Sequence, residues 1–338
     1  MGSITVCFTY DVNGDDKEIL QREVCYTNGR SDKIVITNKE IIISGTRSSK
    51  SQPKDILVNT KSTFYSQLLK AIVYVYMTSG KKFNLGTTLV TVDGEQESIK
   101  TINPCPKDLD RNLIINKEKC AAVFDDHPRG SDLLIAYIWY VKAIQEDEFD
   151  ELWKSFNSLY SIISAKDQEN EKLKDMRRYF ENNWARFNRL DTYFSGLTEE
   201  SVRKLRIREF ILGTYEKPEK TNSYAEMVKS FDDYRMAQLF KEVMPYRKQE
   251  LVVKNLYSSV VSHIQSRIVA QTNRNVDLAR FTILKYAYFL RNKYFHAEKS
   301  APVFILTENN EIEELGTIKQ IMRLLLSDLM ETVDLFMR

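Results

Sequence analysis

The sequence predicts an α+β protein, in which a strand-rich mixed domain at the N-terminus precedes an all-α helical bundle. Segments rich in β-branched residues are concentrated before a turn cluster at residues 126–130, and after it apolar residues recur every three or four positions. A chain of 338 residues also has room for two domains of roughly 150 residues each. We therefore expect a mixed α/β domain at residues 1–126 and a helical domain at residues 131–338.

The N-terminal domain is expected to contain several short strands. Residues 4–10 alternate apolar and polar side chains and lead into a turn cluster at 11–15, and residues 33–44 are rich in isoleucine. One helix is expected at residues 64–77, and the polar stretch 46–53 is expected to be a loop. Strands are predicted at residues 4–10, 18–26, 33–44 and 87–92, the last of which ends at Asp93-Gly94.

From residue 131 onward the apolar spacing is helical almost throughout. Ser131 or Asp132 can cap a helix that begins at Leu133. A helix with one face in the core is predicted from the stripe Phe149, Trp153, Phe156, Tyr160 and Ile163. Further helices are expected at 168–183, in an extra region near 196–275 with breaks at Gly213, Pro218 and Pro245, at the strongly apolar 278–295, and at 318–336.

The composition excludes several function classes. The formal net charge of +2 creates no global positive field, so any contact with nucleic acid has to come from a local patch. Four widely spaced cysteines and three scattered histidines give no metal site with usable spacing. No phosphate-binding glycine loop is present either. We therefore expect no cofactor and no metal.

The sequence also gives no indication of a membrane segment. The first residues lack the basic start and apolar stretch of a secretion signal, and no uncharged apolar run reaches the ~18 residues that a bilayer span requires. The four cysteines are expected to be free thiols in a reducing compartment. These observations predict a soluble cytoplasmic protein.

The most informative motif lies at the end of the apolar segment 278–295. Arg291, Asn292 and His296 fall within a turn and a half of helix. Guanidinium and amide groups can hold a phosphate, and an imidazole can move a proton near neutral pH, which is sufficient equipment for cutting RNA without a metal. Asn292 and His296 share one helix face, whereas Arg291 lies about 140° round from His296 at about 100° per residue.

Two segments of the second half together resemble the HEPN superfamily of helical-bundle proteins. Residues 153–160 look like the W-x-x-F-N-x-L-Y pattern of that family's first helices, and residues 291–296 match its R-x4-6-H signature, with the preferred polar residue present as Asn292. The resemblance covers residues 131–338. It departs from the family at residues 196–275, which are longer than a minimal bundle requires.

The resemblance implies a metal-independent endoribonuclease that acts as a homodimer, with the two motif helices forming a composite cleft at a twofold axis. His296 would be the general acid or base, Arg291 would hold the scissile phosphate, and Asn292 would orient His296 or a phosphate oxygen. Attack by the ribose 2′-hydroxyl would leave a 2′,3′-cyclic phosphate, and DNA would resist. The family's biology implies a role in prokaryotic defence or in a toxin-like stress response.

Each residue of the motif also has a structural interpretation. His296 could make a local hydrogen bond at a helix end, Arg291 could form an ion pair with Glu298, and Asn292 could end the helix. Asn157, in the earlier segment, is likewise expected to make a structural hydrogen bond and not to be a catalyst. Two other histidines are expected in ordinary positions, His127 in a loop and His263 in the core or an interface. The basic cluster at 203–208 could grip RNA or could form a solvated helix face.

A second function class stays open beside the nuclease. A non-catalytic HEPN-like module that binds RNA, a nucleotide or a protein partner would keep the motif as a structural remnant. A third hypothesis is an antitoxin-paired protein, whose activity is blocked until its partner leaves. The N-terminal domain is expected to be a sensor, a regulator or an RNA-guiding module.

Overall fold

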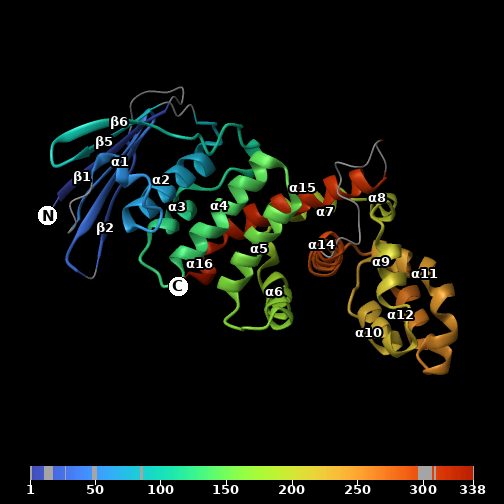
Figure 1. The fold of residues 1–338 in the computed structure, drawn as a ribbon. Coiled ribbons are helices and arrows are strands. Elements are labelled where there is room, and N and C mark those ends of the chain that lie inside the picture. The colour runs from blue at the N-terminus through green and yellow to red at the C-terminus, as the bar shows by residue number, and fades with distance from the viewer. Residues whose placement is uncertain are drawn as a thin grey trace. The chain divides into compact units, whose positions relative to one another are not determined.

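The computed structural model describes residues 2–10, 18–26, 28–47, 52–83, 87–295, 307 and 310–337 (Figure 1). The predicted α+β class is confirmed, because an antiparallel sheet is followed by a largely helical region. The chain divides into two compact units. Unit 1 comprises Met1–Ala165 and Leu329–Arg338, and unit 2 comprises Lys166–Asp328.

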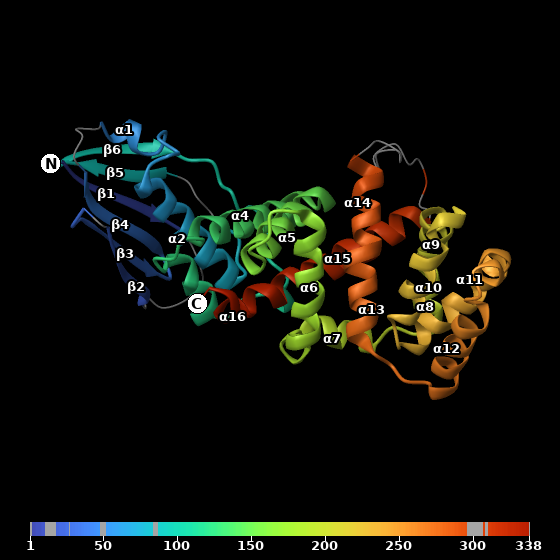
Figure 2. The same ribbon diagram turned by 90° about the horizontal axis from the view of Figure 1, so that it is seen from below.

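A six-stranded antiparallel sheet forms one layer of unit 1, with the strand order β2-β3-β4-β1-β5-β6 (Figure 2). Its side chains alternate between the two faces as the pleat requires. In β1, for example, Ile4, Val6 and Phe8 are buried and Ser3 and Thr9 are exposed. The strands are β1 (Gly2–Thr9), β2 (Glu18–Cys25), β3 (Ser31–Thr37), β4 (Glu40–Arg47), β5 (Thr87–Val92) and β6 (Glu95–Lys100).

One long helix, α2 (Thr63–Ser79), packs against the sheet, where it contacts β3 and β4. The Ser62 hydroxyl caps its first turn by accepting a hydrogen bond from the Tyr65 amide at 3.1 Å. The helix ends at Gly80 with a φ of 69°, and a Cβ atom there would lie 2.8 Å from Ile114 Cδ1. The predicted helix at 64–77 is therefore confirmed, with one turn more than expected.

The predicted strands at 4–10, 18–26 and 87–92 are confirmed, and the segment 33–44 needs a correction. It contains parts of two strands, β3 and β4, which are joined by a bend at Asn38-Lys39. Strand β6 was not predicted because it is an edge strand with almost no buried side chain, so it lacks an apolar alternation. The expected loop at 46–53 is shortened at both ends by β4 and by helix α1, and residues 48–51 lie outside the described residues, as do residues 11–15.

Helices α4 (Gly130–Glu146) and α5 (Phe149–Ile163) complete the main body of unit 1, packed against each other. The predicted aromatic stripe of α5 is buried. Two expectations were wrong: α4 has Arg129 at its N-cap without a side-chain cap, and Asn157 is exposed and its side chain has no partner in the described chain. The shorter helices are α1 (Pro53–Ile56), η1 (Arg111–Leu113), α3 (Lys117–Cys120), η2 (Ala121–Phe124) and α16 (Val333–Phe336).

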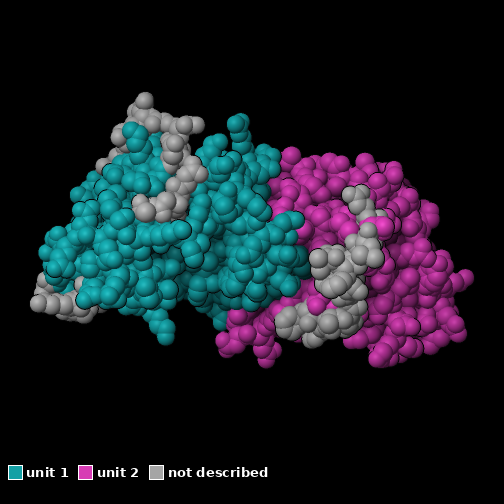
Figure 3. Space-filling view, turned by 45° about the horizontal axis from the view of Figure 1, so that its top comes forward, with its two compact units in different colours: residues 1–165, 329–338 teal, residues 166–328 magenta. Residues whose placement is uncertain are grey.

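The turn at residues 126–130 marks the end of the strand-bearing region, whereas unit 1 continues to Ala165 (Figure 3). The reason lies in packing. Helix α4 contacts both α2, which covers the sheet, and α5. The first two helices after the turn therefore belong with the sheet.

Unit 2 is made of helices, and the extra region near 196–275 is helical as expected. The break predicted at Pro245 was wrong, since α11 runs through this residue, supported by the buried neighbours Val243, Met244 and Arg247. The helices are α6 (Glu169–Asn183), η3 (Trp184–Arg186), α7 (Asn188–Ser195), α8 (Glu199–Lys204), α9 (Ile207–Thr214), η4 (Pro218–Lys220), α10 (Thr221–Lys229), α11 (Tyr234–Val253) and α12 (Tyr257–Ala270).

The apolar segment predicted at 278–295 forms a continuous helix of three parts (Figure 2). They are α13 (Asn275–Phe281), a π-helical turn η5 (Thr282–Ala287) and α14 (Tyr288–Phe295). We call the whole segment 275–295 the motif helix. The final helix, α15 (Asn310–Glu331), ends before the predicted 336, because Thr332 separates it from α16. Within the described residues no helix combines the length and the apolar character that crossing a membrane requires.

Candidate functional site

The motif helix carries two of the three predicted catalytic residues at its C-terminal end. Arg291 and Asn292 are both half-buried in the last turns of α14. His296 lies outside the described residues. The structure therefore describes how Arg291 and Asn292 are arranged, and the position of His296 remains a prediction.

The side chains of Arg291 and Asn292 are joined to each other. The Arg291 Nη1 atom donates to the Asn292 side-chain oxygen at 2.9 Å. Adjacent residues on a helix point about 100° apart, so this bond turns the guanidinium toward the face that carries Asn292. Asn292 thus orients the arginine, whose planar guanidinium is the kind of donor group that binds phosphate oxygens.

The two histidines outside the motif have structural surroundings. His127 lies in a loop, as expected, and its Nδ1 accepts from the Arg129 amide at 3.0 Å. His263 is half-buried, and its Nε2 lies 3.0 Å from the Phe231 carbonyl oxygen. A carbonyl can only accept, so Nε2 carries the proton.

The end of the motif helix lies close to basic residues of another part of unit 2. Burial and the charge of Glu311 raise the pKa of Tyr294, while the charge of Arg206 lowers it. Arg206 in turn forms an ion pair with Glu311, with 2.6 Å between Nη1 and Oε1. The guanidinium of Arg206 is therefore within electrostatic range of the turn that carries Arg291 and Asn292.

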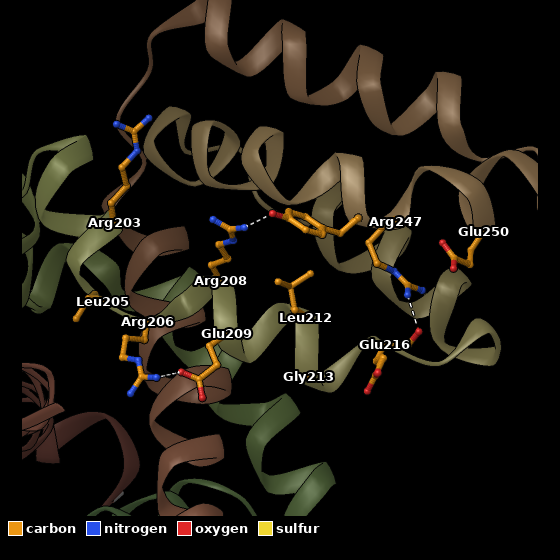
Figure 4. Close-up of a pocket in the computed structure, with 11 residues that line it drawn as sticks. Arg203, Leu205, Arg206, Arg208, Glu209, Leu212, Gly213, Glu216, Arg247 and Glu250 are labelled. Atoms are coloured by element: carbon orange, nitrogen blue, oxygen red, sulfur yellow. Dashed lines mark hydrogen bonds and ion pairs between the residues drawn. The ribbon is translucent and has the colours of Figure 1, made fainter. Parts of the chain in front are cut away.

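Arg206 also lines a cavity of about 830 Å³ between α9 and α11 (Figure 4). The cavity is rich in arginine, and its walls come from the 203–216 segment and from one face of α11. Its lining residues are Arg203, Leu205, Arg206, Arg208, Glu209, Leu212, Gly213, Glu216, Tyr246, Arg247 and Glu250. The volume is that of a pocket for a small organic molecule or a nucleotide.

The arginines of this cavity differ in how far they are neutralised. Arg203 pairs with Glu199 and Glu242, whereas the exposed Arg208 has no carboxylate partner in the described chain. Arg208 instead donates to the Tyr246 hydroxyl and lies over the Tyr246 ring, 4.9 Å from its centroid (Figure 4). A cation on an exposed aromatic ring is a platform on which a base can stack and a phosphate can bind.

The inner end of the cavity is built by Arg247, which is almost fully buried. It donates to the Glu216 carbonyl at 2.6 Å and to the Thr221 hydroxyl at 3.3 Å. Its Nε and the Oε2 of Glu250 are buried without a hydrogen-bond partner among the described residues. A molecule in the cavity could bond to both atoms, because Arg247 Nε is a donor and Glu250 Oε2 is an acceptor.

The basic cluster at 203–208 had two expected roles, a grip on RNA or a solvated helix face, and in the structure it lines this cavity. Helix α8 ends at Lys204 and α9 begins at Ile207, so the cluster spans the junction of two helices and lines the cavity. The signal that sequence reasoning missed is the partner Tyr246, which follows Pro245 in α11. Nothing in the local pattern relates these distant segments.

A scan against protein-family models and searches of curated proteins and solved structures found no match to this chain. Among the described residues no group of three or more histidine, cysteine, aspartate or glutamate side chains could hold a metal ion. Unit 2 is thus a largely helical unit that carries guanidinium groups at the end of the motif helix and around the cavity lined by Arg206.

One buried acid beneath the cluster provides a pH-dependent prediction. Glu314 accepts from the Arg206 amide at 3.0 Å, and burial raises its pKa to about 7. An acid with a raised pKa in the folded state binds more protons when folded, so stability falls as the pH rises from about 4.5 to about 7. Glu314→Gln should therefore stabilise the protein by about 1–2 kcal/mol at pH 8 and by much less at pH 4.5.

Urea unfolding at the two pH values measures this difference. The matched control is Glu313→Gln, because Glu313 is an exposed neighbour in the same helix. The control should change stability little at either pH. A glutamine variant at position 314 that is less stable than the parent at pH 8 would contradict the prediction.

Proposed function

We propose that this protein is a metal-independent endoribonuclease of the HEPN type. The observation that carries the proposal is the bond between Arg291 and Asn292, which orients a guanidinium at the end of the motif helix. Together with the R-x4-6-H spacing to His296, it supplies a phosphate-holding group beside a residue that can transfer protons near neutral pH.

In the proposed reaction His296 removes the proton from the ribose 2′-hydroxyl or protonates the leaving 5′-oxygen. The 2′-oxygen attacks the phosphorus, the bond to the 5′-oxygen breaks, and a 2′,3′-cyclic phosphate remains. Arg291 offsets the charge that develops on the phosphate oxygens, and Asn292 keeps the guanidinium in place. A second copy of the chain supplies the other half of the cleft in a twofold dimer.

The cavity beside Arg206 supports an RNA substrate. A nearly neutral chain needs a local cationic surface to hold a polyanion, and Arg208 on the Tyr246 ring offers one. Restraint by a regulatory or antitoxin protein, and a sensory role for the sheet-bearing part, belong to the same proposal. Defence or a toxin-like stress response is the biological setting that it implies.

The test is cleavage of labelled single-stranded RNA by the full chain in excess EDTA. We expect cleavage that persists in EDTA, that leaves 2′,3′-cyclic phosphate ends, and that disappears in His296→Ala. A strand of the same sequence with 2′-deoxyribose should remain intact. Light scattering at the assay concentration should give the mass of a dimer. Intact RNA after long incubation with the parent protein would overturn the proposal.

A second candidate is a non-catalytic module that binds RNA or a nucleotide, and the Arg208–Tyr246 stack favours it. Fluorescence anisotropy with the same RNA separates the two functions. Binding without cleavage, lost in Tyr246→Ala and unchanged in His296→Ala, would support the module. Loss of cleavage in His296→Ala with binding retained would support the nuclease.

A further inference from the structure

Helix α6 and the motif helix are joined by side chains at two levels. The Tyr288 hydroxyl contacts Glu169 Oε2 at 3.2 Å, and Arg280 Nη1 contacts Glu181 Oε1 at 2.5 Å. Glu169 begins α6 and Glu181 lies near its end, whereas Arg280 precedes Tyr288 along the motif helix. The two helices therefore run antiparallel where these contacts join them.

Two further cations, Arg177 and Lys285, lie along the helices between these two levels, and Arg280 belongs to one of the levels. Arg177 lies on α6 one turn before Glu181, so it is on the same face as the residue that binds Arg280. Lys285 follows Arg280 by five positions, which in an α-helix would turn it about 140° away. The π-helical turn at Thr282–Ala287 has i→i+5 periodicity, and it brings Lys285 back toward the face that carries Arg280.

The carboxylates that pair with Arg280 do not pair with Arg177 or Lys285, although Asp277 also pairs with Arg274. Arg280 forms ion pairs with Glu181 at 2.5 Å and with Asp277 at 3.0 Å. Arg177 and Lys285 are both half-buried, and neither has a hydrogen-bond or ion-pair partner among the described residues. Two partly desolvated cations that act on each other without a carboxylate partner cost free energy, unless an anion binds beside them.

Further observations agree with this arrangement. Burial lowers the pKa of Lys285, and the charges of Arg177 and Arg280 lower it further, without a counteracting carboxylate. The Nε of the buried Arg280 has no hydrogen-bond partner in the described chain. The charge of Arg177 also lowers the pKa of the buried Tyr215 of a third segment, which burial raises.

We infer that Arg177, Arg280 and Lys285 form a binding site for a phosphate group. A phosphate offers several acceptor oxygens and at least one negative charge, which matches an ammonium group and two guanidinium groups. The site is separate from the Arg208–Tyr246 cavity, and it does not depend on the reaction proposed at Arg291. Its place on the motif helix allows an RNA phosphate or a small phosphorylated molecule to occupy it.

The first test measures melting temperature in sodium phosphate against sodium chloride of equal ionic strength. We expect phosphate to raise the melting temperature of the parent. Lys285→Met and Arg177→Gln should require at least tenfold more phosphate for the same rise. The matched controls are Lys174→Met and Arg178→Gln, which remove exposed, ion-paired cations of α6 and should respond like the parent.

In the absence of phosphate, the melting temperatures of Lys285→Met and Arg177→Gln measure the repulsion between the cations of the site. Lys285→Met should melt at the same temperature as the parent or above it, because one of the facing charges is removed. This keeps a lost phosphate response distinct from a loss of folding. A parent protein that does not respond to phosphate, or a Lys285→Met protein that responds like the parent, would overturn the inference.

The second test identifies where the phosphate comes from. Anisotropy is measured with 2′-O-methyl RNA, which cannot undergo 2′-hydroxyl attack, and calorimetry is done with adenosine monophosphate. If RNA is the source, Lys285→Met lowers RNA affinity and reduces the salt slope by about one. If a small molecule is the source, nucleotide binding is lost and RNA binding is unchanged. No effect on either ligand would contradict the site, even where RNA is still cleaved.

Discussion

Arg291→Ala is expected to reduce RNA cleavage by a factor of about 10²–10³, which is the usual loss when one preorganised donor to a developing oxyanion is removed. The arginine acts mainly in the transition state, where negative charge on the phosphate oxygens is greatest. Arg291→Lys should lose nearly as much, because an ammonium group keeps the charge without the planar donor fork. Single-turnover cleavage in EDTA measures the chemical step free of product release.

Asn292→Ala tests the same arrangement from the other side. It leaves the guanidinium in place but removes the oxygen that holds it at 2.9 Å, so cleavage should fall less than in Arg291→Ala. Arg178→Ala, at an exposed position of α6, is the control for a general loss of charge. If Arg291→Ala cleaves like the parent while the fold is unchanged, Arg291 has no part in the reaction.

The strands and the long helices could be predicted where one chemical pattern repeats over the whole element. The isoleucines of β3 and β4 identified strands, but the bend at Asn38-Lys39 lacks glycine and proline and so gave no sign that two strands were present. Strand β6 is polar because its face is open to solvent. Pairing with β5 places it in the sheet, and such pairing is a property of the folded chain.

The features of the candidate site could also be predicted only where their cause is local in the sequence. The bond between Arg291 and Asn292 was not foreseen, although the position of both residues at one helix end could be predicted from the sequence. The π-helical turn could not, since residues 282–287 contain no proline or glycine that would interrupt a helix. It occurs where Phe210 of α9 packs against three rings of the motif helix, Phe281, Tyr286 and Phe289, with centroids 5.7, 6.0 and 5.1 Å away.

The start of the motif helix is held by a buried ion pair that could not be predicted from the local sequence pattern. Asp233 and Arg235 are both fully buried, with 2.7 Å between Oδ2 and Nη2. Arg235 also donates to the Phe194 carbonyl at 2.6 Å and to Asn275 Oδ1 at 2.9 Å, and Asp233 accepts from the Arg274 amide at 2.7 Å. The pair thus connects the end of α7 and the start of α11 to the first residue of α13.

Arg235→Met should destabilise the protein by about 3–5 kcal/mol, because it leaves a buried carboxylate without its cation. It also leaves the Phe194 carbonyl without this donor. Urea unfolding followed by circular dichroism measures the loss, and Arg178→Met, which removes an exposed partner of Asp175, should cost less than about 1 kcal/mol.

A double variant, Asp233→Asn with Arg235→Met, separates the loss of the pair from the loss of packing. Asparagine at position 233 keeps a side-chain oxygen that can accept a hydrogen bond from the backbone amide of residue 235. It also removes the negative charge that Arg235→Met leaves unpaired. The double variant should therefore be more stable than Arg235→Met alone. If the two are equally unstable, the damage comes from the missing guanidinium contacts to Phe194 and Asn275, and the ion pair itself contributes little.

In either case the motif helix loses its hydrogen bond at Asn275. The bond between Arg291 and Asn292 is made at the opposite end of the helix. RNA cleavage should therefore decline in proportion to the folded fraction and no faster.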